Sequence, residues 1–396
     1  MINYILFDDN STDLLPLTYT RPVAELRVGI LTIRQKWGKY LKSEISWLTE
    51  DYLSIKFPLI KGEDNIYING SVLPDSKIVK SILNLKTGQC LVKANIVIAA
   101  RCNHSLAETF SGNICKASDI VQFQGELNKI NFLWDIFLNN GKAIETDFLL
   151  LTKNRKSQAI GKSNHVKSPE NIFIEKGAKV EYASLNAENG TIYIGKDAEI
   201  MEGCLIRGPF AICESSILKM GAKIYGPTTI GPNSKIGGEI SNCIVQANSN
   251  KAHDGFLGNS VIGEWCNIGA DSNNSNLKNN YTEVKLWSYT QGKFISTGLQ
   301  FCGLIMGDHS KCGINTMFNT GTVVGVSANI FGAGFPRNFI PSFSWGGPQG
   351  MSVYPLDKAL DTASKVFQRR GLELAVTDRK ILENIFLITD KEHRYS

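Results

Sequence analysis

The sequence predicts an α/β domain over residues 1–155, a parallel β-helix over residues 171–335 and α-helices at the C-terminus. Three patterns carry this prediction: a six-residue repeat in the middle of the chain, short alternating apolar stretches near the N-terminus, and two amphipathic segments near the C-terminus. The repeat is the strongest of the three. It sets an aliphatic residue at every sixth position, at Ile194, Ile200, Ile206, Ile212, Leu218, Ile224, Ile230 and Ile236.

A period of six excludes the common alternatives for this segment. An α-helix would repeat at roughly 3.6 residues and a plain strand at roughly 2, whereas hexapeptide repeats are typical of β-helices with stacked aliphatic interiors. The repeat shifts by two residues to Ile244 and breaks over Asp271 to Tyr281. We expect such shifts to mark loops that leave the coil corners. The later repeat positions are Phe256, Ile262, Ile268, Met306, Cys312, Phe318, Val324 and Ile330.

The first 155 residues hold several short apolar stretches and one amphipathic segment. INYILF, from Ile2, alternates as a buried strand does, and ILTIRQKWGKYL, from Ile30, has the spacing of an amphipathic helix. NIYING, QCLVKANIVIAA and ETDFLLLT predict further short buried strands. This mixture predicts an α/β domain. The polar residues 156–170 that follow are the predicted linker.

Residues 336–396 predict an extended segment followed by helices. The stretch after Ile330 is rich in Gly, Pro and aromatic residues and should be ordered but extended. In the first predicted helix, one face collects Leu356, Leu360, Ala363 and Phe367. In the second, Thr377 is the expected N-cap, and the apolar residues are Ile381, Leu382, Ile385 and Phe386.

Composition limits the classes of partner. The chain has 42 Lys and Arg against 37 Asp and Glu, a net charge of +5, without a dense basic block, which argues against a nucleic-acid partner. Its nine cysteines form no CxxC pair, as expected in a reducing cytoplasm. The first ten residues turn acidic too early for a signal peptide, and no run of about eighteen apolar residues occurs. The sequence therefore predicts a cytoplasmic protein with no membrane partner.

One of the five histidines, His253, directly precedes the glycine-punctuated stretch from Phe256 to Ala270. An imidazole is neutral near pH 7 and can act as a general base, although a loop histidine taken alone is more often a structural or solvated residue than a catalytic one. The surrounding residues read GEISNCIVQANSNKAHDGFLGNSVIGEWCNIGA, followed by SNLKNNYTEVKL and later by MGDHSKCGIN.

These motifs and the domain order resemble the sugar-1-phosphate nucleotidyltransferases that carry a C-terminal left-handed β-helix acyltransferase domain, including the bifunctional glucosamine-1-phosphate acetyltransferase/N-acetylglucosamine-1-phosphate uridyltransferase. The resemblance implies a nucleotidyltransferase-like, Rossmann-like first domain and a left-handed β-helix. It also implies acetyl-CoA as acyl donor, and a homotrimer whose CoA sites lie between neighbouring helices.

The resemblance assigns expected roles to residues of the β-helix. His253 would be the general base, and the backbone N–H of Ala270, about one coil face away, would point at the thioester oxygen. Acceptor contacts are expected from Phe256, Asn267, Asn276 and Lys285. Alternatively, the asparagines only satisfy turn backbone and the lysine is a solvated charge. Phe256 stands where the family has tyrosine, and Ser241 where it has a phosphate-binding lysine, which leaves an acceptor other than glucosamine-1-phosphate open.

The first domain departs further from the family. Its loop after the first strand, DDNSTDLLPLTYTRPVAELRVG, lacks the usual glycines, but Arg21 and Arg27 can supply cations for the phosphates of a nucleoside triphosphate or sugar phosphate. Where a metal-binding aspartate is usual, INGSVLPD offers Asn69, with Asp75 further on. We therefore assign no metal ligand, and Mg²⁺ is expected only if this domain is active.

The sequence leaves two functions open, one of an enzyme and one of a non-catalytic protein. The first is a transferase of nucleotide-sugar biosynthesis, an acetyl-CoA-dependent N-acetyltransferase on an amino-sugar phosphate or nucleotide sugar, with an active or vestigial nucleotidyltransferase domain. The second is a non-catalytic trimeric scaffold or regulatory sugar-nucleotide-binding protein. A zinc carbonic anhydrase of this fold needs three histidine ligands, whereas the predicted repeat holds only His253 and His309, and His309 is interpreted as a corner residue.

Overall fold

The computed structural model describes residues 2–103 and 119–395, which form two compact units. The N-terminal unit comprises Met1–Leu14, Thr20–Leu26 and Leu31–Asn131, and the β-helix unit comprises Leu15–Tyr19, Arg27–Ile30 and Phe132–Ser396. Two short pieces of the loop after the first strand therefore belong to the β-helix unit. The first unit also ends at Asn131, whereas the sequence predicts a first domain to residue 155.

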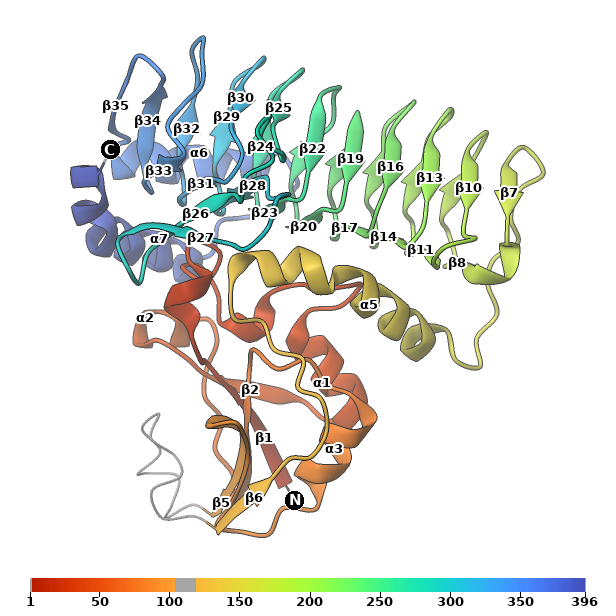
Figure 1. The fold of residues 1–396 in the computed structure, drawn as a ribbon, viewed down its shortest axis with the longest axis vertical. Helices are drawn as coiled ribbons and strands as arrows, with labels where there is room; N and C mark the ends of the chain where they lie inside the picture. Colours follow the sequence, from red (N-terminus) through yellow and green to blue (C-terminus); the bar gives the residue numbers. More distant parts are fainter. Residues whose placement is uncertain (1, 104–118, 396) are drawn as a thin grey trace. The chain divides into compact units, whose positions relative to one another are not determined.

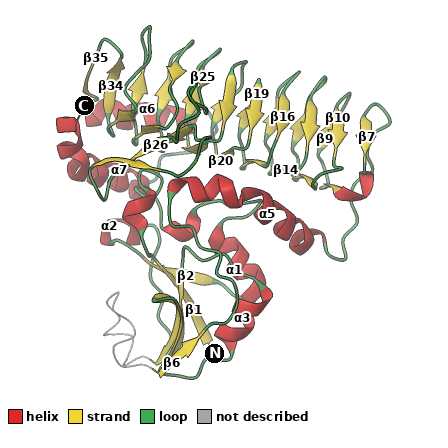
Figure 2. Ribbon diagram, in the orientation of Figure 1, coloured by secondary structure: helices red, strands yellow, loops and turns green. Residues whose placement is uncertain are grey.

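The N-terminal unit is built on one mixed sheet with strand order β2-β1-β3-β5-β4-β6 (Figure 2). Strand β1, second in this order, pairs in parallel with both β2 and β3, so the carboxyl ends of these three strands meet at one edge. The strands are β1 (Ile2–Phe7), β2 (Ile45–Leu48), β3 (Asp64–Asn69), β4 (Gln89–Lys93), β5 (Ile96–Asn103) and β6 (Asp119–Gln122). The α/β character predicted from the alternating apolar stretches is confirmed.

Capping residues start the helices of this unit. The Thr32 side chain accepts a hydrogen bond from the Gln35 backbone N–H, and the Gln35 side chain accepts one from the Thr32 backbone N–H, which forms a capping box at the start of α1. Asp75 caps α3 through the backbone N–H groups of Lys77 and Ile78. The helices are η1 (Ser11–Leu14), η2 (Val23–Glu25), α1 (Ile33–Leu41), α2 (Asp51–Ser54) and α3 (Ser76–Leu83).

Helix α5 (Leu133–Thr152) corrects one prediction, because ETDFLLLT forms its last turns instead of a strand. Its buried residues follow a helical spacing, among them Ile136, Asn140, Ile144 and Phe148. In the β-helix unit this helix runs along one face of the coils, and its residues pack with Phe173, Tyr193 and Ala211 (Figure 1). In the sequence, the consecutive apolar residues at the end of this helix obscure its helical period.

The rest of the second unit is a three-sided parallel β-helix, which confirms the predicted fold class (Figure 1). In the described residues its faces are three sheets, and each of the first six coils contributes one short strand to each sheet. The first sheet contains β7 (His165–Lys167), β10 (Ser184–Asn186), β13 (Leu205–Arg207), β16 (Lys223–Tyr225), β19 (Glu239–Ser241) and β22 (Phe256–Gly258). Coil structure therefore begins with β7, inside the segment predicted as linker.

The other two faces continue further toward the C-terminus. The second sheet contains β8 (Ile172–Ile174), β11 (Ile192–Ile194), β14 (Phe210–Ile212), β17 (Thr228–Ile230), β20 (Ile244–Ala247), β23 (Val261–Glu264), β28 (Leu304–Met306), β31 (Thr322–Val324) and β33 (Phe339–Ile340). The third contains β9 (Lys179–Val180), β12 (Glu199–Ile200), β15 (Ile217–Leu218), β18 (Lys235–Ile236), β21 (Asn250–Lys251), β24 (Asn267–Ile268), β29 (Lys311–Cys312), β32 (Asn329–Ile330), β34 (Ser344–Gly347) and β35 (Gly350–Val353).

All repeat positions predicted from Ile194 to Ile236 lie in the buried interior. After that point the coils change length, because Lys235 aligns with Asn250 and Asn250 aligns with Asn267, offsets of 15 and then 17 residues. Val245 and Leu257 consequently fill the interior positions that the repeat predicted for Ile244 and Phe256. Phe256 faces outward as a result.

An insertion and a helical segment complete this unit. Between β25 (Asn273–Asn274) and β28, the chain forms the hairpin of β26 (Lys285–Ser288) and β27 (Lys293–Ser296), while β25 itself pairs with β30 (Met317–Phe318). The remaining elements are η3 (Pro169–Asn171), α6 (Leu356–Gln368), α7 (Val376–Thr389) and η4 (Asp390–Tyr395). Helix α7 begins at Val376 after Ala375, so the prediction of Thr377 as its N-cap is wrong.

Candidate functional site

His253 lies on the exposed turn between β21 and β22, at a corner of the β-helix. The turn is fixed from inside by Lys251, which aligns with the interior residue Ile236 and is itself buried. Its Nζ donates to the carbonyl oxygens of Gly237 (3.1 Å), His253 (2.5 Å) and Asp254 (3.1 Å). Burial lowers the pKa of Lys251 to about 8. The corner thus presents a solvent-accessible imidazole on a backbone held by a buried amine.

Neighbouring coils are offset by 17 residues here, so the predicted site residues lie in pairs, one above the other, on successive coils. The backbone N–H of Asp271 donates to the carbonyl of Asp254 at 3.1 Å, which joins the turn carrying Ala270 to the turn carrying His253. Ala270 therefore lies one coil further along the same corner, not on a neighbouring face, because Asn250 and Asn267 stand in register.

Two acceptor candidates are brought together on the outward side of β22. A Cβ atom added at Gly258 would lie 2.5 Å from Cζ of Phe256 and 2.7 Å from Nδ2 of Asn276, so both side chains lie over this glycine. The Asn276 amide donates to Oδ1 of Asn259 at 2.8 Å. Oδ1 of Asn273 accepts the backbone N–H of Phe256 at 2.7 Å. These amides hold the phenyl ring beside the corner.

Asn267 and Lys285 occupy different surroundings. Asn267 is exposed on β24, in register with Asn250 and Lys311. Lys285 is exposed at the start of β26 and lines a separate cavity of the insertion. His309 is buried at a corner with φ of 61°, and its ring lies beside the stacked pair of Trp265 and Phe367, 6.4 and 6.2 Å from their ring centres, as a structural corner residue would.

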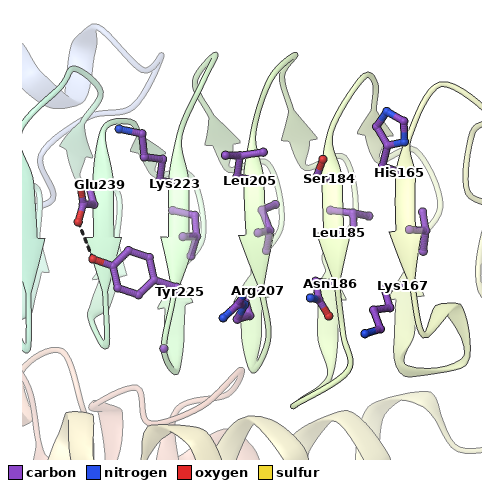
Figure 3. Close-up of a pocket in the computed structure, with 14 residues that line it drawn as sticks. His165, Lys167, Ser184, Leu185, Asn186, Leu205, Arg207, Lys223, Tyr225 and Glu239 are labelled. Atoms are coloured by element: carbon purple, nitrogen blue, oxygen red, sulfur yellow. Dashed lines mark hydrogen bonds between the residues drawn. The ribbon is translucent and has the colours of Figure 1, made fainter.

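The open face of the first sheet forms a shallow pocket of about 800 Å³ in the same unit. Figure 3 shows side chains of successive coils side by side on this face, with Arg207 and Tyr225 among them and the Tyr225 hydroxyl donating to Glu239 at 2.5 Å. Leu205 and Val166 are exposed there. The face mixes apolar and basic side chains, and β22 next to the His253 corner ends the same sheet.

A polar cluster of the N-terminal unit lies where β1 and β3 end. Asp9 accepts from the Asn69 amide at 2.7 Å and pairs with Lys129 at 3.3 Å, and Lys129 also donates to Asn10 at 2.8 Å. Crevices at the carboxyl ends of parallel strands are the usual ligand sites of α/β sheets. Among residues 2–103 and 119–395, no group of three or more His, Cys, Asp or Glu side chains is suited to hold a metal ion.

Asp8 supports the loop beside this cluster. Its carboxylate accepts the backbone N–H of Val23 at 2.8 Å and the hydroxyl of Thr49 at 2.5 Å. Burial raises the pKa of Asp8 to about 6. The carboxylate thereby ties the loop containing Arg21 to the ends of β1 and β2.

The two predicted phosphate-binding arginines fall in different compact units. Arg21 belongs to the N-terminal unit and is buried. Arg27 belongs to the β-helix unit, where its guanidinium donates to the carbonyls of Gln246 (3.1 Å) and Ile30, and the Gln246 side chain accepts its backbone N–H at 2.7 Å. Arg27 is therefore engaged with its own unit's backbone.

Sequence reasoning missed Lys251, Asn273 and Lys129. Lys251 had a usable signal, because a coil of 15 residues counted from Ile236 sets a lysine at an interior repeat position. Asn273 and Lys129 had none, since each acts through a contact that only the folded chain brings about.

In the described parts of the chain, no helix combines the length and apolar character that crossing a bilayer requires.

Comparison with known proteins bears out the resemblance. Residues 4–156 match the family model described as sugar nucleotidyl transferase. The bifunctional sugar-1-phosphate nucleotidylyltransferase/acetyltransferase of Sulfurisphaera tokodaii is 33% identical over 144 residues, 36% of this chain and 35% of that protein. The bifunctional protein GlmU of Methanocaldococcus jannaschii is 32% identical over 100 residues, 25% of this chain and 24% of the relative. The matches thus span about a third or less of these relatives.

Among solved structures, the UDP-N-acetylglucosamine acyltransferase of Arabidopsis aligns with a TM-score of 0.25 and 18% identity, over 55% of this chain and 78% of that one.

Proposed function

We propose that this protein is an acetyl-CoA-dependent N-acetyltransferase of nucleotide-sugar biosynthesis, which acts on an amino sugar linked to a phosphate or a nucleotide. His253 is the general base in this proposal. One observation carries it: the imidazole is exposed on a turn that the buried Lys251 holds by two hydrogen bonds, while a third joins Lys251 to Gly237 on the preceding coil. A base must be accessible to the amine and fixed in position, and this corner meets both needs. The names of the bifunctional relatives support the same chemistry.

In the reaction, His253 takes a proton from the acceptor amine while the amine nitrogen attacks the thioester carbon of acetyl-CoA. The amide bond forms as the carbon–sulfur bond breaks, and CoA leaves as the thiol. The backbone N–H of Ala270, for which no partner is found among the described residues, stabilises the developing oxyanion. Its position one coil along the same corner from His253 supports this role.

Phe256, Asn267, Asn276 and Lys285 are proposed to contact the acceptor. Phe256 and Asn276 offer an apolar and a polar surface over Gly258, next to the corner turn. The phenyl ring makes no hydrogen bond to a sugar hydroxyl, which favours an acceptor recognised by its phosphate or nucleotide part. Lys285 is a cation suited to such a group.

A homotrimer is part of the proposal. The exposed Leu205 and Val166 on the open face of the first sheet support burial against a second copy, since apolar side chains gathered on one face commonly mark an interface. A neighbouring copy there would border the His253 corner, because β22 belongs to the same sheet. Cyclic symmetry would then repeat the shared site three times.

The N-terminal unit is proposed to bind a nucleoside triphosphate or sugar phosphate at the ends of β1 and β3. Lys129 and the buried Arg21 supply cations there, and the match to sugar nucleotidyl transferases supports this ligand class. If the unit turns over, Mg²⁺ is the expected metal.

The test is a parallel screen. Amino-sugar phosphates and nucleotide-linked amino sugars are each mixed with acetyl-CoA and the protein, and free thiol is read. Several nucleoside triphosphates with sugar 1-phosphates are assayed beside them for pyrophosphate release. Thiol release that depends on one amino sugar supports the acetyltransferase. Acetyl-CoA that fails to bind at all would favour the non-catalytic scaffold or regulatory binder instead.

A further inference from the structure

A second cavity of the β-helix unit lies against the hairpin of β26 and β27, and the proposed acetyl transfer leaves most of it unexplained. Its volume is about 790 Å³. The walls combine three cations, Lys278, Lys285 and Arg337, with three aromatic rings, Trp287, Phe294 and Phe339. We call this cavity the hairpin pocket.

The charge of the hairpin pocket is entirely positive. Among the described residues that line it there is no carboxylate, and neither Lys285 nor Arg337 forms an ion pair in the described part of the chain. Both of these side chains are exposed. Lys278 is held in place, since its Nζ donates to the carbonyl of Glu283 at 2.7 Å. Three cations without counter-charges attract an anion of two or more charges.

The aromatic residues supply a flat apolar surface next to these cations. Trp287 and Phe339 stack with ring centres 4.3 Å apart and are buried, and Phe294 stands edge-on to Trp287 at 5.3 Å. Phe294 is 40% exposed, so its ring is the surface that a ligand can reach. An exposed ring supported by two buried ones is a stable platform for a planar group.

The pocket wall is also firmly built. Val284 and Leu286, on either side of Lys285, are buried. Gly321 has φ of 68°, and a Cβ atom there would lie 2.3 Å from the carbonyl oxygen of Lys285. The hairpin strand therefore rests directly on the turn of a later coil, which fixes the position of the Lys285 backbone.

From this combination we propose that the hairpin pocket binds a nucleoside diphosphate group, with the diphosphate on the cations and the base on Phe294. A diphosphate matches the cations, and base stacking on aromatic side chains is a general means of holding a nucleobase. The volume also exceeds what an isolated phosphate would fill. Two ligands contain this chemistry: a nucleotide-linked sugar and CoA. Because these are the donor and one acceptor of the proposed reaction, and Lys285 is shared, the inference rests on the proposed function for the source of the ligand, whereas its test concerns binding alone.

The experiment is isothermal titration calorimetry on the full chain without an acyl donor. The ligands are UDP, ADP, inorganic pyrophosphate, UDP-N-acetylglucosamine and CoA. The variants are Lys285→Ala, Arg337→Ala and Phe294→Ala. Lys293→Ala is the matched control, since Lys293 lies exposed on the same hairpin but outside the pocket lining. The control separates a built site from a general effect of charge.

We expect each pocket variant to weaken nucleoside diphosphate binding about ten-fold, and Lys293→Ala to leave it unchanged. Phe294→Ala should leave the binding of pyrophosphate unchanged. Arg337→Ala should weaken the binding of both pyrophosphate and the nucleoside diphosphates. Tighter binding of CoA than of the UDP-sugar would identify the donor as the source, and the reverse order the acceptor.

Because the N-terminal unit matches sugar nucleotidyl transferases, nucleotide binding by the whole chain is not sufficient support. Nucleotide affinities equal to the parent's in all three pocket variants would overturn the proposal. Pyrophosphate binding as tight as that of UDP and ADP would overturn the role of Phe294. Neither result depends on turnover, so the acetyltransferase proposal is tested separately.

Discussion

The buried amine of Lys251 should contribute to the pH dependence of the stability of the β-helix unit, and Lys251→Met should remove that contribution. Burial lowers the pKa of Lys251 to about 8 from 10.5. Between these pH values the unfolded chain binds more protons than the folded chain, so stability rises as pH rises through the window. The window covers about 2.5 pH units at about 1.4 kcal/mol each, which gives a full increase of about 3.5 kcal/mol, of which about 3 kcal/mol falls between about pH 7.5 and 10.5.

The assay is urea unfolding followed by circular dichroism at about pH 7.5, 9 and 10.5, at one protomer concentration. The free energy of unfolding of the parent, relative to Lys251→Met, should increase by about 3 kcal/mol from the lowest to the highest pH. Lys293→Met, a change on the exposed hairpin, should keep the parent's dependence. Parallel curves for the parent and Lys251→Met would refute the reasoning, because the amine would then not be titrating in a buried environment.

Three further predictions concern chemistry, loop and assembly. His253→Ala should lower kcat for acetyl transfer by about 10²–10⁴-fold while acetyl-CoA affinity is kept, read as thiol release and calorimetry; near-normal turnover would reduce His253 to a loop residue. Arg27→Ala should destabilise the β-helix unit by about 3 kcal/mol in thermal unfolding, whereas Arg21→Ala should weaken the calorimetric binding of phosphate-bearing ligands; equal binding by the Arg21→Ala, Arg27→Ala double mutant would exclude both from that site. Light scattering should give three times the chain mass of 43.7 kDa, and a monomer mass at micromolar concentration would remove the shared site.

The β-helix was predictable because its interior repeats an aliphatic residue at a fixed interval over many coils, and Ile194 to Ile236 carry that signal without interruption. Helix α5 was not, because LLL at its end suggests a strand, while the residues that set its helical period include the buried polar Asn140 and Asp147. Those two side chains accept hydrogen bonds from the backbone N–H groups of Gly29 and Ile30. No local sequence pattern predicts these contacts.

Only those residues of the candidate site that lie in a recognisable sequence motif were predictable. His253, Phe256 and Ala270 stand in one continuous stretch, and their stacking on successive coils depends on a coil length that the repeat left ambiguous. The hairpin pocket could not be predicted from the sequence, since the five strands β28 to β32 separate Phe294 from Arg337 along the chain. Side chains that are brought together by the stacking of coils have no characteristic spacing in the sequence, so no sequence pattern predicts that they meet.

The two N-terminal pieces that belong to the β-helix unit bear on how the chain folds during synthesis. Arg27 emerges from the ribosome 219 residues ahead of Gln246, its hydrogen-bond partner, and Tyr19 emerges 373 residues ahead of Glu392, which accepts from its hydroxyl at 2.5 Å. The coils can stack one by one as they are translated, because each contacts its neighbours. The early pieces must instead wait for distant partners, Arg27 until the coil of Gln246 has formed and Tyr19 until translation is nearly complete. A gene cut between the two units would therefore deprive the later one of segments that only the earlier portion encodes.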